Sequence, residues 1–260
     1  MRFIAALRFL TVIPLPIRRE ATPGQVGGSL VYFPAVGLLI GLVLAALYWV
    51  LHLVLPQEMV FALLLAATVL LNGALHIDGF IDTCDGLAGN KTAEERWQVM
   101  RDSRVGAFGV AGAVLLMLAK YASLVSLPDR LIPAVLVLMP LLGRWAMTFA
   151  IVAFPYARPS GLGAIFKGEA KPMAFAVSTG CAVVAAAGVA VVARTVYPHL
   201  FALAVVLGVW LIAAIWAAYL GRKFEGLTGD SYGAVNEVAE VSAAVVVNIL
   251  AFGGWLGARG

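Results

Sequence analysis

The sequence predicts an all-α, polytopic integral membrane protein with about seven transmembrane helices and an N-terminal interfacial helix. Of its 260 residues, 62% are hydrophobic and only 12% are charged, a balance that soluble domains do not show. Apolar windows of about 20 residues, the length that crosses a bilayer, recur along the chain. The charged residues gather mainly between these windows. We therefore expect a single membrane-embedded domain covering residues 1–260.

The first element is an amphipathic segment that precedes the apolar windows. Arg2 and Arg8 stand among large apolar residues, and Pro14 and Pro16 close the stretch. A charge inside the apolar run and the lack of a small-residue cleavage site argue against a signal peptide. We expect an interfacial helix instead, within an interfacial segment formed by residues 1–28.

Seven apolar windows follow, and each predicts one membrane-spanning helix. The second window is short and can continue into the acidic motif that comes after it. Prolines near several window ends begin or kink the helices. The windows are residues 32–54, 60–75, 107–127, 131–154, 173–193, 200–220 and 238–256.

The basic residues are distributed unevenly over the loops, which predicts an orientation. Thirteen of the 18 Lys and Arg residues lie before the first window or after the second, fourth and sixth windows, whereas Arg130, Arg194 and Arg259 lie on the other side. The positive-inside rule then places the N-terminus and the long loops in the cytoplasm and the C-terminus outside. The net charge of +4 follows from this topology. Nucleic acid is not indicated, because no basic stripe has interleaved aromatic residues.

A first acidic motif follows the second window. Asp78, Asp82 and Asp85 are spaced i, i+4 and i+7, so on a helix they lie within about 60° of one another. Like charges on one face repel, and beside a bilayer they need a cation to neutralise them. Oxygen-only ligands favour Mg²⁺ or Mn²⁺, and Mg²⁺ usually binds together with substrate phosphates.

A second acidic motif precedes the last window. Asp230 is a candidate N-cap of the helix that follows, and Glu237 lies seven residues on, nearly in phase with it. Asn236 and Glu240 are four residues apart on a neighbouring face. Glu240 begins to enter the apolar run, where a carboxylate needs a metal or a basic partner. Both motifs are predicted on the cytoplasmic side, so together they can surround one or two divalent ions.

Basic residues beside glycines make candidate phosphate contacts. Arg101 and Arg104 precede Gly106 and Gly109, and Arg158 precedes a similar Gly-rich segment. Arginine matches phosphate bidentately, and glycine lets backbone N–H groups approach an anion. The alternative is that these arginines are positive-inside anchors.

Three further polar residues have alternative interpretations. His76 lies two residues before the first aspartate, so on a continuous helix it points away from the carboxylates; it either satisfies the backbone or reaches substrate or metal. Arg144, inside a window, is either a counter-ion for a carboxylate or a phosphate clamp. Lys120 is assigned to interfaces and helix packing.

The chain resembles a known family at these motifs. Residues 75–87, which read Leu-His-Ile-Asp-Gly-Phe-Ile-Asp-Thr-Cys-Asp-Gly-Leu, are similar to the HxDGxxDxxDG signature of cobalamin synthase, also called adenosylcobinamide-GDP ribazoletransferase. The resemblance extends over nearly the whole chain, through residues 8–14, 100–109, 156–158 and 229–237 in the family's order. Cys84 departs from the small residue expected there and leaves the carboxylates untouched.

The resemblance implies the last assembly step of the cobamide lower ligand, at the bacterial cytoplasmic (inner) membrane with the active site facing the cytoplasm. The hydroxyl of α-ribazole, or of its 5′-phosphate, attacks the phosphate attached to adenosylcobinamide in adenosylcobinamide-GDP. GMP leaves, and adenosylcobalamin or its 5′-phosphate forms in a Mg²⁺-dependent reaction. Membrane lipid is a further partner, and a homo-oligomer or an association with other cobamide-assembly enzymes is compatible with this role. The residues alone had indicated metal, phosphates and a cytoplasmic membrane site, but neither corrinoid, GDP nor ribazole.

These considerations lead to a hypothesis for the site. Asp78, Asp82 and Asp85 bind Mg²⁺ on the diphosphate, and Asp230 or Glu237 completes the coordination or holds a second ion. The same three aspartates and Glu237 are the catalytic candidates, because a remaining carboxylate takes the proton of the attacking hydroxyl, with His76 as a weaker alternative. The candidate substrate contacts are Arg101, Arg104, Arg158, His76 and Asn236.

Two other classes fit the residues without the resemblance. An enzyme like the CDP-alcohol phosphotransferases also uses spaced aspartates at a cytoplasmic helix end. A cation-coupled transporter has intramembrane carboxylates, but it should show charges near the midplane and an internal repeat. Here the charges cluster at one face, and no convincing repeat is present.

Overall fold

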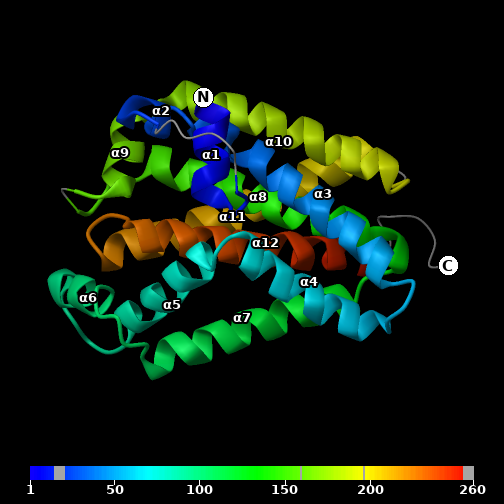
Figure 1. The fold of residues 1–260 in the computed structure, drawn as a ribbon, viewed down its shortest axis with the longest axis horizontal. Helices are drawn as coiled ribbons and strands as arrows, with labels where there is room; N and C mark the ends of the chain where they lie inside the picture. The colour runs from blue at the N-terminus through cyan, green and yellow to red at the C-terminus, as the bar shows by residue number, and fades with distance from the viewer. Residues whose placement is uncertain (15–20, 159, 196, 254–260) are drawn as a thin grey trace.

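The computed structural model describes residues 1–14, 21–158, 160–195 and 197–253, and this part of the chain is built almost entirely of helices (Figure 1). Six helices are long and apolar enough to cross a membrane, and a bent pair makes a seventh span if it is counted as one. The predicted class, an all-α polytopic membrane protein, is thus confirmed. The α-helices are α1 (Arg2–Leu10), α2 (Pro23–Gly27), α3 (Phe33–Leu51), α4 (Gln57–Leu71), α5 (Leu75–Leu87), α6 (Ala93–Val99), α7 (Ala107–Val125), α8 (Ile132–Ala153), α9 (Leu162–Glu169), α10 (Pro172–Val192), α11 (Pro198–Lys223) and α12 (Gly229–Phe252).

The second apolar window ends in a bend rather than running straight into the acidic motif. Helix α4 ends at Leu71, and α5, which carries the aspartates, leaves it at 90°. Gly73 and Ala74 both have φ of 58° at this point. The left-handed conformation interrupts the helix, and for an alanine it is uncommon. The bend gives α5 a direction of its own and frees it to pack against α12.

Helix α8 is the centre of the bundle. Within the span Asp129–Ala153, 94% of the apolar stretch is buried inside the protein. Helix α8 packs against α3, α12 and α10. Gly37 and Gly41 of α3 face the α8 backbone so closely that a Cβ on either would overlap it. Small residues at such crossings let membrane helices approach closely and gain van der Waals contact. This matters because lipid provides no hydrophobic driving force for helix association. The core is therefore built around α8, with α12 against one of its sides.

The N-terminal helix lies against one end of the bundle. Helix α1 has 9 residues, too few to span a bilayer. Its Phe9 ring lies 4.8 Å from that of Phe166 in α9 and 5.9 Å from that of Phe33 in α3, centroid to centroid. Helices α1, α2 and α9 lie together beside the beginning of α10 (Figure 1). An interfacial position for α1 agrees with this arrangement.

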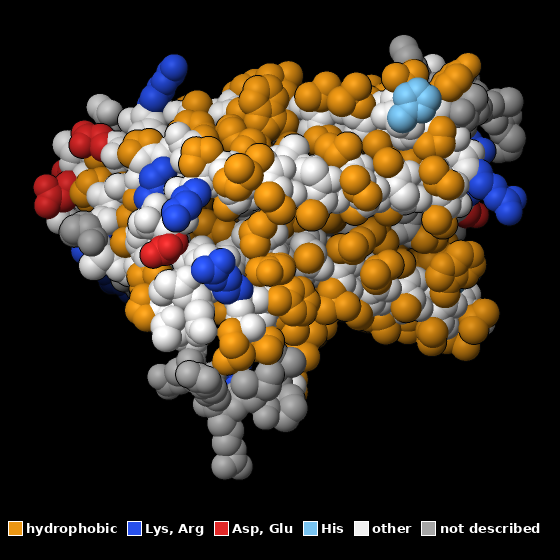
Figure 2. All heavy atoms as spheres, turned by 90° about the horizontal axis from the view of Figure 1, so that it is seen from above, with side chains coloured by type: hydrophobic (Ala, Val, Ile, Leu, Met, Phe, Trp, Pro, Cys, Tyr) orange, Lys and Arg blue, Asp and Glu red, His pale blue; other side chains and the backbone are white. Residues whose placement is uncertain are grey.

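The surface agrees with a membrane-embedded bundle. Figure 2 shows apolar side chains over the long middle part of the molecule, with Lys, Arg, Asp and Glu toward its ends. Large apolar side chains such as Leu115, Ile215 and Val184 are more than half exposed. Exposed apolar residues over this whole length suit contact with lipid.

Candidate active site

The two acidic motifs meet because α5 packs unusually closely against the beginning of α12. A Cβ on Gly79 would lie 2.8 Å from the carbonyl oxygen of Asp230, and a Cβ on Gly233 would lie 3.1 Å from the carbonyl oxygen of His76. Real Cβ atoms do not come as near as the one at position 79 would, and a Cβ at position 233 would make an unusually tight contact. The glycine that follows Asp78 in the motif therefore has a packing role: it brings the aspartates of α5 to the first turn of α12.

The first turn of α12 is held by the segment that follows α8. Leu227 N–H donates to Pro155 at 2.9 Å, and Ala157 N–H donates to Leu227 at 2.8 Å. The N-cap of α12 is Thr228, whose hydroxyl accepts from the backbone N–H of Ser231 at 3.1 Å. This corrects the expectation that Asp230 is the cap. Because its side chain does not cap the helix, the Asp230 carboxylate remains available at the positive end of the α12 dipole.

The side chains of Asp78, Asp82, Asp230 and Arg158 gather where these two helices meet. Asp82, partly buried, is acted on by the negative charges of Asp230, Asp78 and Asp85 and by the positive charge of Arg158. Arg158 Nη2 donates to Asp230 Oδ2 at 3.3 Å. The structure thus brings three predicted aspartates and one predicted arginine together. Within the described ranges, however, no three His, Cys, Asp or Glu side chains are placed to form a complete metal centre.

Asp85 lies at the other end of α5 and has a different environment. Its two carboxylate oxygens accept the backbone N–H groups of Gly106 and Gly109, each at 2.8 Å. A Cβ on either glycine would overlap the carboxylate. The sequence indicated that these glycines admit an anion, and in the structure the anion is Asp85 at the N-terminus of α7.

The other two arginines lie outside this cluster. Arg104 is exposed and pairs with Asp102 at 2.6 Å. Hydrogen bonds from the Arg104 side chain and backbone lower the pKa of the Asp102 carboxyl to about 2. Arg101 is exposed as well, and its charge acts on Tyr156, next to the segment that holds α12. Of the predicted phosphate contacts, Arg158 is therefore at the centre, Arg101 near its edge, and Arg104 is directed to Asp102.

The rest of the second acidic motif is engaged in a buried ionic network. Lys120 Nζ donates to Glu237 Oε2 and to Glu240 Oε2, each at 2.6 Å. Arg144 Nη1 donates to Glu240 Oε1, which also accepts from the Asn236 amide at 3.1 Å. All five side chains are at most 5% exposed. The network holds two carboxylates and two cations, so its formal charge is balanced.

This network corrects one interpretation and settles others. Lys120 was assigned to interfaces and helix packing, but it is a buried counter-ion for two carboxylates. Arg144 is a counter-ion for Glu240, the first of its two alternatives. Glu237 is paired with Lys120, and Asn236 is fully buried and donates to Glu240. The signal for the network was present in the sequence: Lys120, Arg144 and Glu240 fall inside apolar windows, where unpaired charges are costly, and Glu237 directly precedes the last window.

His76, at the start of α5, joins the ionic network to the site. Its Nδ1 lies 3.2 Å from Arg144 Nη2. Its ring is 2% exposed, and Nε2 has no hydrogen-bond partner among the described residues. His76 therefore touches the buried network on one side, while it also helps to line the cavity described next.

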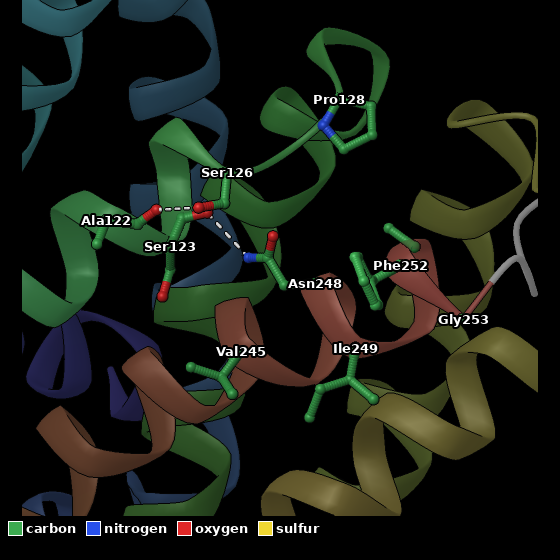
Figure 3. A pocket seen from close by; sticks show the side chains of 10 residues that line it. Ala122, Ser123, Ser126, Pro128, Val245, Asn248, Ile249, Phe252 and Gly253 are labelled. Carbon is green, nitrogen blue, oxygen red and sulfur yellow. Dashed lines mark hydrogen bonds between the residues drawn. The ribbon is translucent and has the colours of Figure 1, made fainter. Parts of the chain in front are cut away.

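A cavity of about 160 Å³ opens beside the carboxylates. Its lining includes Asp78, Asp230, His76 and Tyr232, and α1, α8 and α9 close its other sides. A larger cavity of about 800 Å³ lies between the far ends of α7 and α12 (Figure 3). There Asn248 donates to the carbonyl oxygen of Ser123 at 2.9 Å, and no charged residue lines the space. Of these two cavities, the smaller is the candidate active site, because it adjoins Asp78 and Asp230.

Fold and site together define a polytopic membrane protein with a carboxylate-rich site at one end of its helices. A family model described as cobalamin-5-phosphate synthase matches residues 2–248. A relative named adenosylcobinamide-GDP ribazoletransferase, from Roseiflexus sp. (strain RS-1), is 37% identical over 246 residues, which cover 95% of this chain and 88% of the relative. Relatives with the same name come from Geotalea daltonii, 36% identical with 97% of this chain and 98% of the relative covered, and from Synechococcus elongatus, 38% identical with 91% of each covered. The chain belongs to the cobalamin-5-phosphate synthase family. No solved structure matches it significantly.

Proposed function

We propose that this protein is a membrane-bound transferase that joins the cobinamide phosphate of adenosylcobinamide-GDP to α-ribazole or α-ribazole 5′-phosphate. An O–P bond forms between the ribazole hydroxyl and the phosphate attached to cobinamide, the P–O–P bond breaks, and GMP leaves. The observation that carries this proposal is that Asp78 and Asp230 line one cavity and that the charges of both act on Asp82. The names of the relatives supply the substrates.

Mg²⁺ fits these residues as an ion that is bound jointly by protein carboxylates and substrate phosphates. The aspartates provide only oxygen atoms, and Arg158 is the one basic residue among them in the described part of the chain. Mg²⁺ keeps several waters and is commonly bound through one or two carboxylates plus substrate phosphates, so a complete protein cage is not required. We assign one or two of the carboxylates of Asp78, Asp82 and Asp230 as its protein ligands, with phosphate oxygens and water as the others. When bound, the ion would neutralise diphosphate oxygens and stabilise departing GMP.

The chain's own residues then have separate tasks. Arg158 holds Asp230 and offers its remaining N–H groups to phosphate oxygens. Asp85 joins α5 to the N-terminus of α7 and so sets the direction of the α5 face that carries Asp82. One of the aspartates accepts the proton of the attacking hydroxyl. Glu237, originally a candidate ligand, is assigned to the ionic network, because coordination by its carboxylate would break the pair with Lys120.

The active site is proposed to face the cytoplasm. The acidic cluster lies at the same helix ends as the loops that carry most of the basic residues, including Arg101, Arg104 and Arg158. The positive-inside rule places those loops in the cytoplasm. In the bacterial inner membrane this orientation gives water-soluble ribazole direct access, while the apolar band contacts lipid.

The test is release of GMP by protein in lipid vesicles supplied with adenosylcobinamide-GDP and α-ribazole. Activity should require Mg²⁺ and should disappear on chelation and return with added Mg²⁺. Asp82→Ala should reduce turnover to background while the protein still inserts, whereas Glu58→Gln, an exposed carboxylate at the opposite end, should stay near the wild type. Near-normal turnover by Asp82→Ala would refute the assignment of the site. Turnover of a CDP-linked substrate, or uptake by sealed vesicles without chemical conversion, would favour the two alternative classes.

A further inference from the structure

The cavity of about 160 Å³ beside the carboxylates has two chemically different parts. Helices α5 and α12 contribute the carboxylates of Asp78 and Asp230. Helices α1, α8 and α9 contribute no polar side chain, and their large residues in the lining are Phe9, Met147, Ile151, Leu162 and Phe166. A molecule that fills the cavity should therefore be apolar over most of its surface and polar at the edge that meets α5 and α12.

Aromatic rings make up much of the lining. The ring of Phe9 lies 4.8 Å from that of Phe166, centroid to centroid, and the two planes are tilted by 51°. Tyr232 of α12 adds a third ring to the lining, and this ring stacks on Tyr156 at 6.1 Å. Aromatic rings and the thioether sulfur of a methionine both make favourable contacts with another aromatic ring. The composition of the lining thus favours an aromatic ligand.

Charge and size exclude the other parts of the reaction from this space. In the described part of the chain, no Lys or Arg lines the cavity, and Arg158 lies outside it beside Asp230. A diphosphate in the cavity would meet two carboxylates and no cation, whereas the guanidinium of Arg158 suits a phosphate. An apolar cavity of about 150 Å³ holds one benzene molecule, so a space of about 160 Å³ accepts one small ring system. A corrinoid or a guanine nucleotide is too large for it.

We propose that this cavity is the subsite for the base of the acceptor nucleoside. The ligand class is a neutral and largely apolar heteroaromatic ring, which in α-ribazole is a benzimidazole. The identity of the nucleoside rests on the proposed function. The base packs against Phe9, Met147 and Phe166, and the ribose points toward α5 and α12, where its hydroxyl meets the carboxylates. The diphosphate of the other substrate lies on the Arg158 side of Asp230, outside the cavity.

Binding of the acceptor can be measured without turnover. Radiolabelled α-ribazole is titrated onto the full-length protein in lipid nanodiscs, with no Mg²⁺ and no adenosylcobinamide-GDP present. We expect saturable binding, competition by free benzimidazole, and no competition by inosine, whose base is polar, or by GMP. Displacement by GMP, equal competition by inosine, or the absence of saturable binding would overturn the proposal. These comparisons need only the wild-type protein.

A variant of the lining assigns the binding to this cavity. Phe166→Leu keeps an apolar side chain but removes the ring, so the Kd and the KM for α-ribazole should each rise about three- to tenfold, the range that loss of one aromatic contact gives. The KM for adenosylcobinamide-GDP should not change. The matched control is Phe61→Leu, since Phe61 is equally buried in α4 and stacks on Tyr48 outside the cavity.

The outcomes separate the subsite from the proposed function. An unchanged KM for α-ribazole in Phe166→Leu, or an equal rise in Phe61→Leu, would overturn the subsite while GMP release by the wild type stands. Saturable binding of α-ribazole that Phe166→Leu weakens, without GMP release by the wild type, would support the subsite and refute the proposed function.

Discussion

Removing Lys120 should destabilise the protein far more than removing an exposed lysine. Its ammonium makes two contacts of 2.6 Å with carboxylates, and the three side chains are 1% to 5% exposed. Without it, two carboxylates share the single charge of Arg144 in a buried, low-dielectric place. Breaking a buried ion pair by removal of one partner costs about 3–5 kcal/mol. For Lys120→Met we therefore expect a loss of this size, or a midpoint of thermal unfolding lower by roughly 10 °C.

The assay is thermal unfolding in detergent, with Lys171→Met as the matched control. Adding Glu237→Gln to Lys120→Met should recover a large part of the loss, because it restores the balance of one acid and one base. The double-mutant cycle then measures the coupling between the two side chains. A loss below about 1 kcal/mol for Lys120→Met, the value of an exposed pair, would refute the reasoning. So would a double variant that is less stable than the single one.

Three other predictions concern the geometry around the carboxylates, and all are measured by GMP release and unfolding. Gly79→Ala places a Cβ 2.8 Å from the backbone of Asp230, so it should separate α5 from α12 and reduce kcat by about 100-fold, the effect of a displacement near 1 Å. Gly109→Ala should displace the Asp85 carboxylate and lower turnover similarly. Gly188→Ala, whose Cβ meets no atom within 4 Å, is the control for both variants. Equal activity of the three variants would contradict the packing argument. Arg158→Lys keeps the charge but loses the planar fork, so KM for adenosylcobinamide-GDP should rise about tenfold or more, and an unchanged KM would show that Arg158 does not contact phosphate.

The spans were predictable because each needs only a long apolar window and polar ends. The bend between α4 and α5 was not predictable in the same way. It arises at Gly73 and Ala74, where two consecutive residues adopt positive φ, and an alanine carries no local signal for that conformation. The close packing of Gly79 on α12 depends on the direction that this bend gives to α5. Contacts of this kind belong to the tertiary structure, whereas hydropathy describes one segment at a time.

The acidic site shows what helical phase can and cannot predict. Asp230 and Glu237 share a face because seven residues make nearly two turns, but seven residues also separate them by about 10 Å along the axis. Metal–oxygen bonds are about 2 Å long. Two side chains whose positions are that far apart on one helix are therefore too distant to bind the same ion. The same distance separates Asp78 from Asp85 on α5, and it explains why Asp85 meets α7 while Asp78 lines the cavity. Helical phase groups acidic residues by face, but depth along the axis divides them into a carboxylate site and a buried ionic network.

That division has a chemical consequence, and His76 lies where the two parts meet. The carboxylates near the cavity are few enough to leave room for substrate oxygens, because the deeper acids are already neutralised by Lys120 and Arg144. His76 contacts Arg144 of that network through Nδ1 at 3.2 Å and also lines the cavity. The network therefore keeps the deeper acids paired within the protein, and the carboxylates beside the cavity remain available to a bound cation and a diphosphate substrate.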